Sequence, residues 1–155
     1  MKIKIKKLHP DAIIPKYAHK GDSGFDLHAL EDVFLNPGET KLIKTGMAIS
    51  VGEGFELQVR PRSGLSLKTP LRIANAPGTV DSSYLGEICV IVTNTSNNEY
   101  ISYDCTWDGC VKQDIKKGDR IAQGVVCPVM RVEFEEVEEL ENTDRGSGGF
   151  GSSGK

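Results

Sequence analysis

The chain has 155 residues, which is enough for one domain with a hydrophobic core and too few for two. Its formal net charge of −3 gives no overall positive field for a nucleic-acid backbone, and Lys and Arg alternate with acidic residues. The longest apolar runs, such as Ile88 to Val92, are far too short to span a membrane, and Met1 to Lys4 begin a strand and not a signal peptide. We therefore expect a soluble, cytoplasmic protein that binds neither nucleic acid nor membrane.

Short strands joined by turns are predicted along the whole chain, because glycine, proline and β-branched residues are frequent and helical periodicity is hard to find. At most one short helix fits, after Ser63. This pattern is typical of an all-β sandwich or barrel. In chain order, the expected strands lie at 3–5, 33–35, 40–43, 47–51, 55–59, 71–74, 87–93, 100–103, 120–126 and 131–137.

Two segments depart from this pattern. Residues 94–114 form a long polar insertion that we interpret as an extended hairpin, and from Asn142 the chain loses apolar periodicity and becomes rich in glycine. A glycine-rich tail cannot bury enough apolar surface to fold alone. We expect one domain at 1–141, with the inserted hairpin at about 95–114, and a flexible segment at 142–155.

The four cysteines are unevenly spaced in a chain without an export signal, which predicts reduced thiols and not a disulfide framework. Cys105 and Cys110 lie at the tip of the insertion, where they either close a small loop, bind zinc with partners elsewhere, or have no role. Zinc is disfavoured because the three histidines lie far back in the sequence.

The triplet Arg62-Ser63-Gly64 offers a planar fork of donors, a hydroxyl group and a backbone that an anion can approach closely. These groups suit phosphate oxygens. An ordinary strand-to-helix turn with Ser63 as the N-cap fits the local sequence equally well.

Asp81 and Tyr84 lie three residues apart between glycines, where a carboxylate can sit beside a reacting water and a ring beneath a sugar. Locally the favoured alternative is an Asx-turn in which Asp81 bonds its own loop and Tyr84 packs at the sheet edge.

Gly118-Asp119 is typical of a turn, and Asp119 and Arg120 form a candidate structural pair. Gln123 is polar within an apolar strand, which indicates a ligand or an interface. In the tail, a cation, hydroxyl groups and a stacking ring on a glycine chain suit the closure of a nucleoside triphosphate site. These tail residues are Arg145, Phe150, Ser152 and Ser153.

The order of the segments carries more information than any one of them. Five segments resemble the five motifs of the homotrimeric dUTP pyrophosphatases in family order, and the resemblance runs from Lys2 to Gly154 with the insertion as its main gap. It implies a distorted jelly-roll barrel and a dUTP diphosphatase that limits uracil incorporation into DNA and supplies dUMP for thymidylate synthesis. The segments lie at 18–27, 61–64, 78–87, 118–123 and 145–154.

For the nucleoside, the resemblance implies that Asp81 holds a water in line with the α-phosphorus and contacts the 3′-hydroxyl. Tyr84 would lie against the deoxyribose and exclude a 2′-hydroxyl. Asn75 and the backbone of residues 76–80, which include Gly78, Thr79 and Val80, would read the uracil edge. Cys89 would border the base pocket as wall and not as nucleophile.

For the triphosphate, the resemblance implies that Arg62, Ser63 and Gly64 form the phosphate-binding turn, with Ser63 near the bridging oxygen. Gln123 would contact the α-phosphate or its water. In the tail, Phe150 would stack on the uracil, and the γ-phosphate would be held in the segment that includes Arg145, Gly151, Ser152 and Ser153.

Mg²⁺ keeps waters and prefers phosphate oxygens, so we expect it to arrive with the triphosphate and not in a protein cage. The resemblance implies that Asp26 touches it through water, and a structural acid that fixes its own loop is an equal alternative. For Asp22 a plain turn is favoured.

The family also implies a homotrimer with shared active sites, in which one subunit gives the first, second and fourth motifs, another the third and another its tail. Two alternatives compete with this interpretation. A dCTP deaminase would need a glutamate where Ile91 stands, and a regulatory binding protein would use the 95–114 insertion as its contact surface for a protein partner. Gly124 stands where the family usually has a larger apolar residue, which leaves open how the core is filled there.

Overall fold

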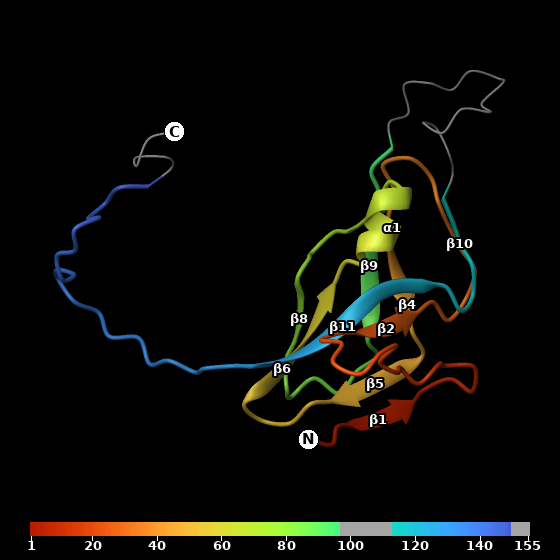
Figure 1. Cartoon of the computed structure of the whole chain (residues 1–155), viewed down its shortest axis with the longest axis horizontal. Helices are drawn as coiled ribbons and strands as arrows, with labels where there is room; N and C mark the ends of the chain where they lie inside the picture. Colours follow the sequence, from red (N-terminus) through yellow and green to blue (C-terminus); the bar gives the residue numbers. More distant parts are fainter. Residues whose placement is uncertain (97–112, 150–155) are drawn as a thin grey trace.

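The computed structural model describes residues 1–96 and 113–149. Within these residues the chain forms strands and one short helix, which confirms the all-β prediction with a single helix beginning at Ser63 (Figure 1). The elements are β1 (Lys4–Lys7), β2 (Phe25–His28), β3 (Val33–Leu35), β4 (Thr40–Lys44), β5 (Met47–Ser50), β6 (Phe55–Arg60), α1 (Ser63–Lys68), β7 (Leu71–Ile73), β8 (Gly78–Val80), β9 (Cys89–Asn94), β10 (Gln113–Ile115) and β11 (Arg120–Pro128).

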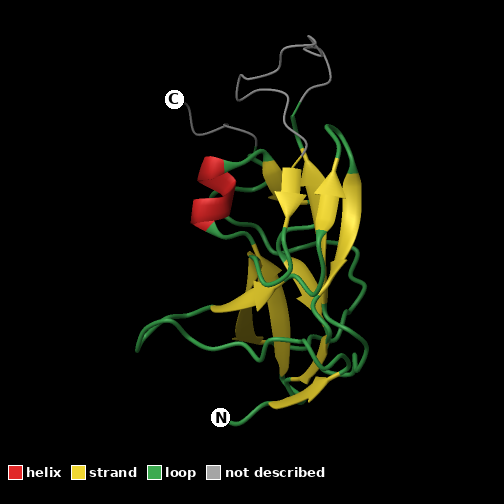
Figure 2. Ribbon diagram, turned by 90° about the vertical axis from the view of Figure 1, so that its right-hand side faces the viewer, coloured by secondary structure: helices red, strands yellow, loops and turns green. Residues whose placement is uncertain are grey.

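The described strands pair into four antiparallel sheets. The largest has the order β2-β11-β6-β8, the next has the order β4-β9-β7, and β1-β5 and β10-β3 are two-stranded. Figure 2 shows these strands stacked against one another with α1 at their side. Because β11 pairs with both β2 and β6, and β6 pairs with β8, four of the five motif segments are carried on or beside neighbouring strands.

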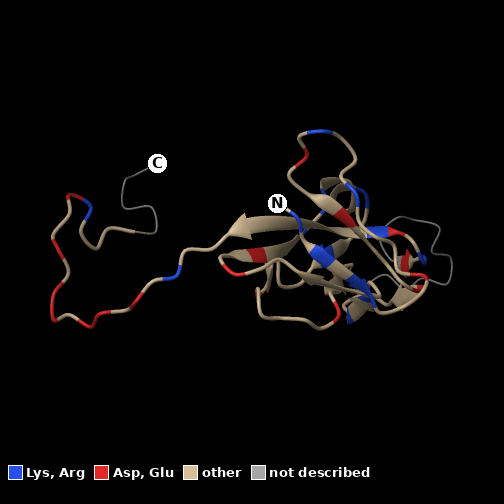
Figure 3. Cartoon of the chain, turned by 90° about the horizontal axis from the view of Figure 1, so that it is seen from below, with Lys and Arg blue, Asp and Glu red and all other residues tan. Residues whose placement is uncertain are grey.

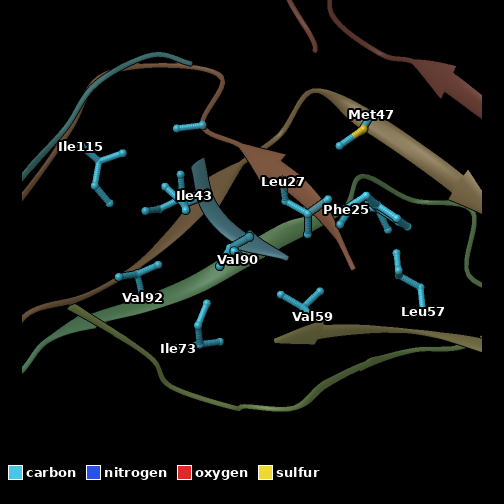
Figure 4. Close-up of a cluster of buried hydrophobic side chains, with 14 of the residues drawn as sticks. Phe25, Leu27, Ile43, Met47, Leu57, Val59, Ile73, Val90, Val92 and Ile115 are labelled. Atoms are coloured by element: carbon cyan, nitrogen blue, oxygen red, sulfur yellow. The ribbon is translucent and has the colours of Figure 1, made fainter. Parts of the chain in front are cut away.

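The core is filled by residues from facing strands (Figure 4). Successive side chains of a strand point to opposite faces, so Val90 and Val92 of β9 are buried while Cys89 and Ile91 face the other way and stay half-buried. Leu57 and Val59 of β6 follow the same alternation. Burying a side chain of this kind stabilises the fold by about 1.5–3 kcal/mol.

The core beside Gly124 is filled from the neighbouring strand. Gly124 pairs with Phe25 of β2, and a Cβ atom at position 124 would lie 2.5 Å from Cε2 of the Phe25 ring. Phe25 is 5% exposed, and Tyr17 packs edge-on against it with the ring centroids 5.8 Å apart. The missing side chain at Gly124 therefore makes room for the phenylalanine ring.

The strand predicted at 131–137 is wrong. After β11 ends at Pro128, the described chain contains no further strand and runs away from the body (Figure 1). Val132 and Phe134 are 64% and 96% exposed, so the apolar alternation that predicted a strand meets no partner within the described part of this chain. We define this arm as residues 129–149, and Figure 3 shows several Asp and Glu positions, in red, along it.

Three short strands, β2, β8 and β10, were not among the predicted strands, because three or four residues carry too little alternation to be recognised. The strand predicted at 100–103 and most of the insertion lie outside the described residues. No helix in the described part of the chain is long and apolar enough to cross a membrane.

Candidate active site

A pocket of about 270 Å³ lies beside β8 and β9, and we name it the Asp81 pocket. It brings together most of the residues that the resemblance assigns to the nucleoside; residues 76 and 77 do not line it, and Phe150 lies outside the described residues. Its lining consists of Leu42, Val59, Asn75, Gly78, Thr79, Val80, Asp81, Tyr84, Glu87, Ile88, Cys89 and Ile91.

The wall of the Asp81 pocket follows from the alternation of β9. Because Val90 points into the core, its neighbours Cys89 and Ile91 point toward the pocket. Burial, and then the nearby Glu87 carboxylate, raise the pKa of the Cys89 thiol. A thiol held in its protonated form is a poor nucleophile, so this side chain suits an apolar wall.

The carboxylate of Asp81 makes no hydrogen bond to its own loop. The turn after β8 is closed by the main chain, since the Tyr84 N–H donates to the Asp81 carbonyl oxygen at 3.1 Å. Among the described residues the Asp81 carboxylate has no hydrogen-bond partner, and the residue is exposed. The Asx-turn alternative is therefore wrong, and the carboxylate is free to receive a proton.

Tyr84 lies at the edge of the same pocket and is 47% exposed. Its hydroxyl donates to the Glu87 carbonyl oxygen at 3.0 Å. This bond ties the Tyr84 hydroxyl to the backbone of Glu87, three residues later, while the ring lines the pocket.

A second pocket, of about 360 Å³, contains the residues predicted to bind phosphate, and we name it the Arg62 pocket. It collects side chains from three distant segments, because β11 lies between β2 and β6. Its lining consists of Ala18, Asp22, Ser23, Gly24, Asp26, Arg62, Ser63, Gly64, Arg120 and Gln123.

Asp26 fixes the orientation of the arginines in this pocket. Arg62 Nε lies 2.7 Å from Asp26 Oδ1, and Arg62 Nη1 donates to the Arg120 carbonyl oxygen at 3.0 Å. The second Asp26 oxygen lies 3.5 Å from Arg120 Nη1. Two guanidinium groups share one carboxylate, so the three side chains together keep a net positive charge that suits an anion. Asp26 thus has a structural role, but it holds arginines of two other segments and not its own loop, as the sequence alternative had it.

Ser63 is the first residue of α1, and the N-cap is Arg62, whose side chain makes no capping bond. The alternative in which Ser63 serves as the N-cap is therefore wrong. The Ser63 side chain is exposed and lines the Arg62 pocket. Gln123 Nε2 donates to the Pro61 carbonyl oxygen at 2.8 Å, which ties the side chain to the end of β6.

Arg120 was predicted to pair with Asp119, and that prediction is wrong. Asp119 accepts the Lys116 N–H at 2.8 Å to close the turn, while Arg120 lines the Arg62 pocket. A strict alternation would place Arg120 and Gln123 on opposite faces. The register shifts between Arg120 and Ala122, so both reach one pocket, and no sequence pattern announces such a bulge.

Asp22 lies in a plain turn, as predicted, because its carboxylate accepts the His19 N–H at 2.7 Å. In the arm, Arg145 is exposed and its Nε donates to the Gly148 carbonyl oxygen at 2.8 Å. The remaining predicted tail residues, Phe150, Gly151, Ser152 and Ser153, lie outside the described residues.

The two pockets have no lining residue in common, so the described part of one chain does not bring Asp81 and Arg62 into a single site. In the described ranges 1–96 and 113–149, no three His, Cys, Asp or Glu side chains gather in a way that could hold a metal ion.

Comparison with known proteins connects these pockets to one family. A sequence profile described as dUTPase matches residues 10–105 and 108–154. The chain is 51% identical over 155 residues to the deoxyuridine 5′-triphosphate nucleotidohydrolase of Nautilia profundicola, covering 100% of both chains. It is 50% identical over 154 residues to the enzyme of that name from Helicobacter pylori strain P12, covering 99% of this chain and 97% of that one.

Solved structures agree with the sequence relatives. The dUTPase of Staphylococcus bacteriophage 80alpha with dUPNHPP is 32% identical, with a TM-score of 0.83 and coverage of 99% of both chains. A mutant dUTPase from phage phi11 of S. aureus, described with a structural Mg(II) ion, is 31% identical with a TM-score of 0.80, and the match covers 92% of this chain and 100% of that chain.

Proposed function

The chain belongs to the dUTPase family, and from this premise we propose that it hydrolyses dUTP to dUMP and pyrophosphate through a water molecule activated by Asp81. The match over the full length to named deoxyuridine 5′-triphosphate nucleotidohydrolases makes it a dUTP diphosphatase. Limiting uracil in DNA and supplying dUMP for thymidylate synthesis are the proposed consequences. The observation that carries the mechanism is the Asp81 carboxylate at the Asp81 pocket, which has no partner among the described residues.

In the proposed step, the oxygen of the water forms a bond to the α-phosphorus while Asp81 accepts its proton. The bond from the α-phosphorus to the bridging oxygen breaks, and pyrophosphate leaves with that oxygen. General-base help of this kind contributes about 10²–10⁴ in rate. The same carboxylate contacts the 3′-hydroxyl of the sugar.

The rest of the Asp81 pocket holds the nucleoside in this proposal. Asn75 and the backbone of residues 76–80 read the uracil edge, Tyr84 lies against the deoxyribose, and Cys89 borders the base. The pocket position at Ile91 supports hydrolysis over deamination, because an apolar side chain there cannot move protons on a cytosine ring.

The Arg62 pocket binds the phosphates in this proposal. The Arg62 fork, the Ser63 hydroxyl and the Gly64 backbone meet phosphate oxygens, with Ser63 near the bridging oxygen and Gln123 near the α-phosphate. Charge-assisted bonds from an arginine to phosphate are about twice as strong as bonds between neutral groups.

Mg²⁺ fits this arrangement as a partner of the substrate. Asp26 is paired with Arg62 at 2.7 Å, which leaves its oxygens engaged by arginine. The triphosphate oxygens are therefore the proposed inner ligands, and Asp26 reaches the ion at most through water. The ion supplies charge neutralisation and orientation of the phosphates.

A homotrimer completes the site in this proposal. The separation of the Asp81 and Arg62 pockets supports a site built from different subunits, and the exposed apolar side chains of the arm need a partner to cover them. The tail of another subunit then closes the site, with Phe150 on the uracil and the segment containing Arg145, Gly151, Ser152 and Ser153 on the γ-phosphate. The exposed apolar arm residues are Val129, Met130, Val132, Phe134, Val137 and Leu140.

Three expectations stay predictions. They are the division into a domain at 1–141 and a flexible segment at 142–155, the cytoplasmic location, and a protein partner at the 95–114 insertion.

The proposed reaction is tested by incubating the protein with dUTP, dCTP, dTTP or UTP in the presence of Mg²⁺ and separating the products. We expect pyrophosphate and dUMP from dUTP alone. Release of ammonia from dCTP, or equal hydrolysis of all four nucleotides, would contradict the proposal.

A further inference from the structure

Gly86 allows the phenol of Tyr84 to lie directly on the backbone of its own loop. A Cβ atom at position 86 would lie 2.5 Å from the Tyr84 hydroxyl oxygen and 2.6 Å from the ring carbon that carries it. Real Cβ atoms do not approach other atoms this closely, so any side chain at position 86 would push the ring away.

Two hydrogen bonds close this loop around the ring. The Tyr84 N–H donates to the Asp81 carbonyl oxygen at 3.1 Å, and the Tyr84 hydroxyl donates to the Glu87 carbonyl oxygen at 3.0 Å. Asp81 and Tyr84 are therefore held in a fixed relation, although Tyr84 is about half exposed and has no core packing to immobilise it.

The far end of the loop is tied to the turn between β4 and β5. Glu87 Oε1 accepts the Gly46 N–H at 2.8 Å, and the Thr45 hydroxyl donates to the Ile88 carbonyl oxygen at 2.5 Å. The Ile88 N–H donates to the Met47 carbonyl oxygen at 2.8 Å. Thr45 is 1% exposed, so this anchor is embedded in the core.

We propose that Gly86 and Glu87 are positioning residues that hold the Tyr84 ring in place and so set the selection of deoxyribonucleotides over ribonucleotides. The inference rests on the proposed function, in which Tyr84 lies against the sugar. The Tyr84 ring excludes a 2′-hydroxyl only if the ring is held in place, because a ring free to rotate would make room for the extra oxygen. The Thr45 to Met47 turn thereby contributes to substrate choice without touching substrate.

The test compares kcat/KM for dUTP and for UTP in Gly86→Ala, Glu87→Ala and Glu87→Gln. We expect the ratio of the two values to fall about tenfold in Gly86→Ala, which is the effect of about 1.4 kcal/mol. Glu87→Ala lowers the ratio about threefold, as loss of one hydrogen bond predicts, through faster UTP turnover. Glu87→Gln keeps an acceptor for the Gly46 N–H and retains the wild-type ratio.

Two further variants separate the outcomes. Tyr84→Ala reports on the proposed function itself, and Glu31→Ala removes an exposed acid outside both pockets as the matched control. If Tyr84→Ala leaves the ratio unchanged, the sugar contact in the proposed function fails. If Tyr84→Ala lowers the ratio while folded Gly86→Ala and Glu87→Ala do not, the positioning role alone is overturned. Should Gly86→Ala fail to fold by thermal unfolding, Glu87→Ala against Glu87→Gln decides.

Discussion

The Asp81 pocket and the Arg62 pocket are built in opposite ways. The first is lined mainly by apolar side chains and by residues of the segment 78–91, and its polar contacts are uncharged or backbone bonds, within the loop and to the turn between β4 and β5. The second collects charged side chains from three segments and holds them with ion pairs. An uncharged nucleoside can be held largely by the shape of one loop set against strands, whereas a triphosphate needs several cations that long-range strand pairing brings together.

The largest expected effect comes from deleting the chain from Arg145 onward. Both pockets remain in this variant, but the proposed closure that joins them is lost, so hydrolysis of dUTP should disappear. Pyrophosphate release measures the activity, and light scattering measures the assembly, which should be unchanged. Loss of the assembly would show that the tail stabilises the subunits and not the closed site.

Asp81→Asn should lower kcat by about two or more orders of magnitude, because the amide cannot accept the proton of the water. Binding of a non-hydrolysable dUTP analogue, followed by calorimetry, should stay close to that of the unchanged protein. A normal kcat would remove Asp81 from the mechanism and leave its pocket as a binding element only.

Arg62→Gln should lower kcat/KM for dUTP by about 10- to 100-fold, which is the range expected when a charge-assisted bond to phosphate is lost. Because the change lies in the other pocket, binding of deoxyuridine should not change. Arg72→Gln, at an exposed arginine outside both pockets, is the matched control. Equal effects of the two substitutions would mean that only overall charge matters.

Asp26→Asn separates the two roles considered for Asp26 and should have the smallest effect of the four. Loss of the carboxylate partner of Arg62 should raise KM for dUTP about three- to tenfold, as loss of one charged bond predicts. If Asp26 only orients the arginine, the Mg²⁺ concentration that gives half-maximal activity stays the same. A higher Mg²⁺ requirement would instead support a contact to the ion through water.

The sequence was informative where a pattern was long or a motif was local. The strands predicted at 55–59, 87–93 and 120–126 correspond to β6, β9 and β11, and the resemblance of the five segments anticipated many of the residues that line the two pockets. Arg120 was misplaced because a bulge shifts the register of β11. The strand at 131–137 was predicted from real alternation, yet a strand needs a neighbour, and the described part of this chain offers none.

The Asp81 and Arg62 pockets share no lining residue, so the two pockets can be inactivated separately and tested for complementation between subunits. If each site takes Asp81 from one chain and Arg62 from another, two variants that are each impaired can restore activity to one another. Subunits carrying Asp81→Asn, unfolded and refolded together with subunits carrying Arg62→Gln, should form hybrids in which some sites inherit both intact side chains. Activity in the mixture well above the residual activity of either parent would be the signature of a site divided between chains.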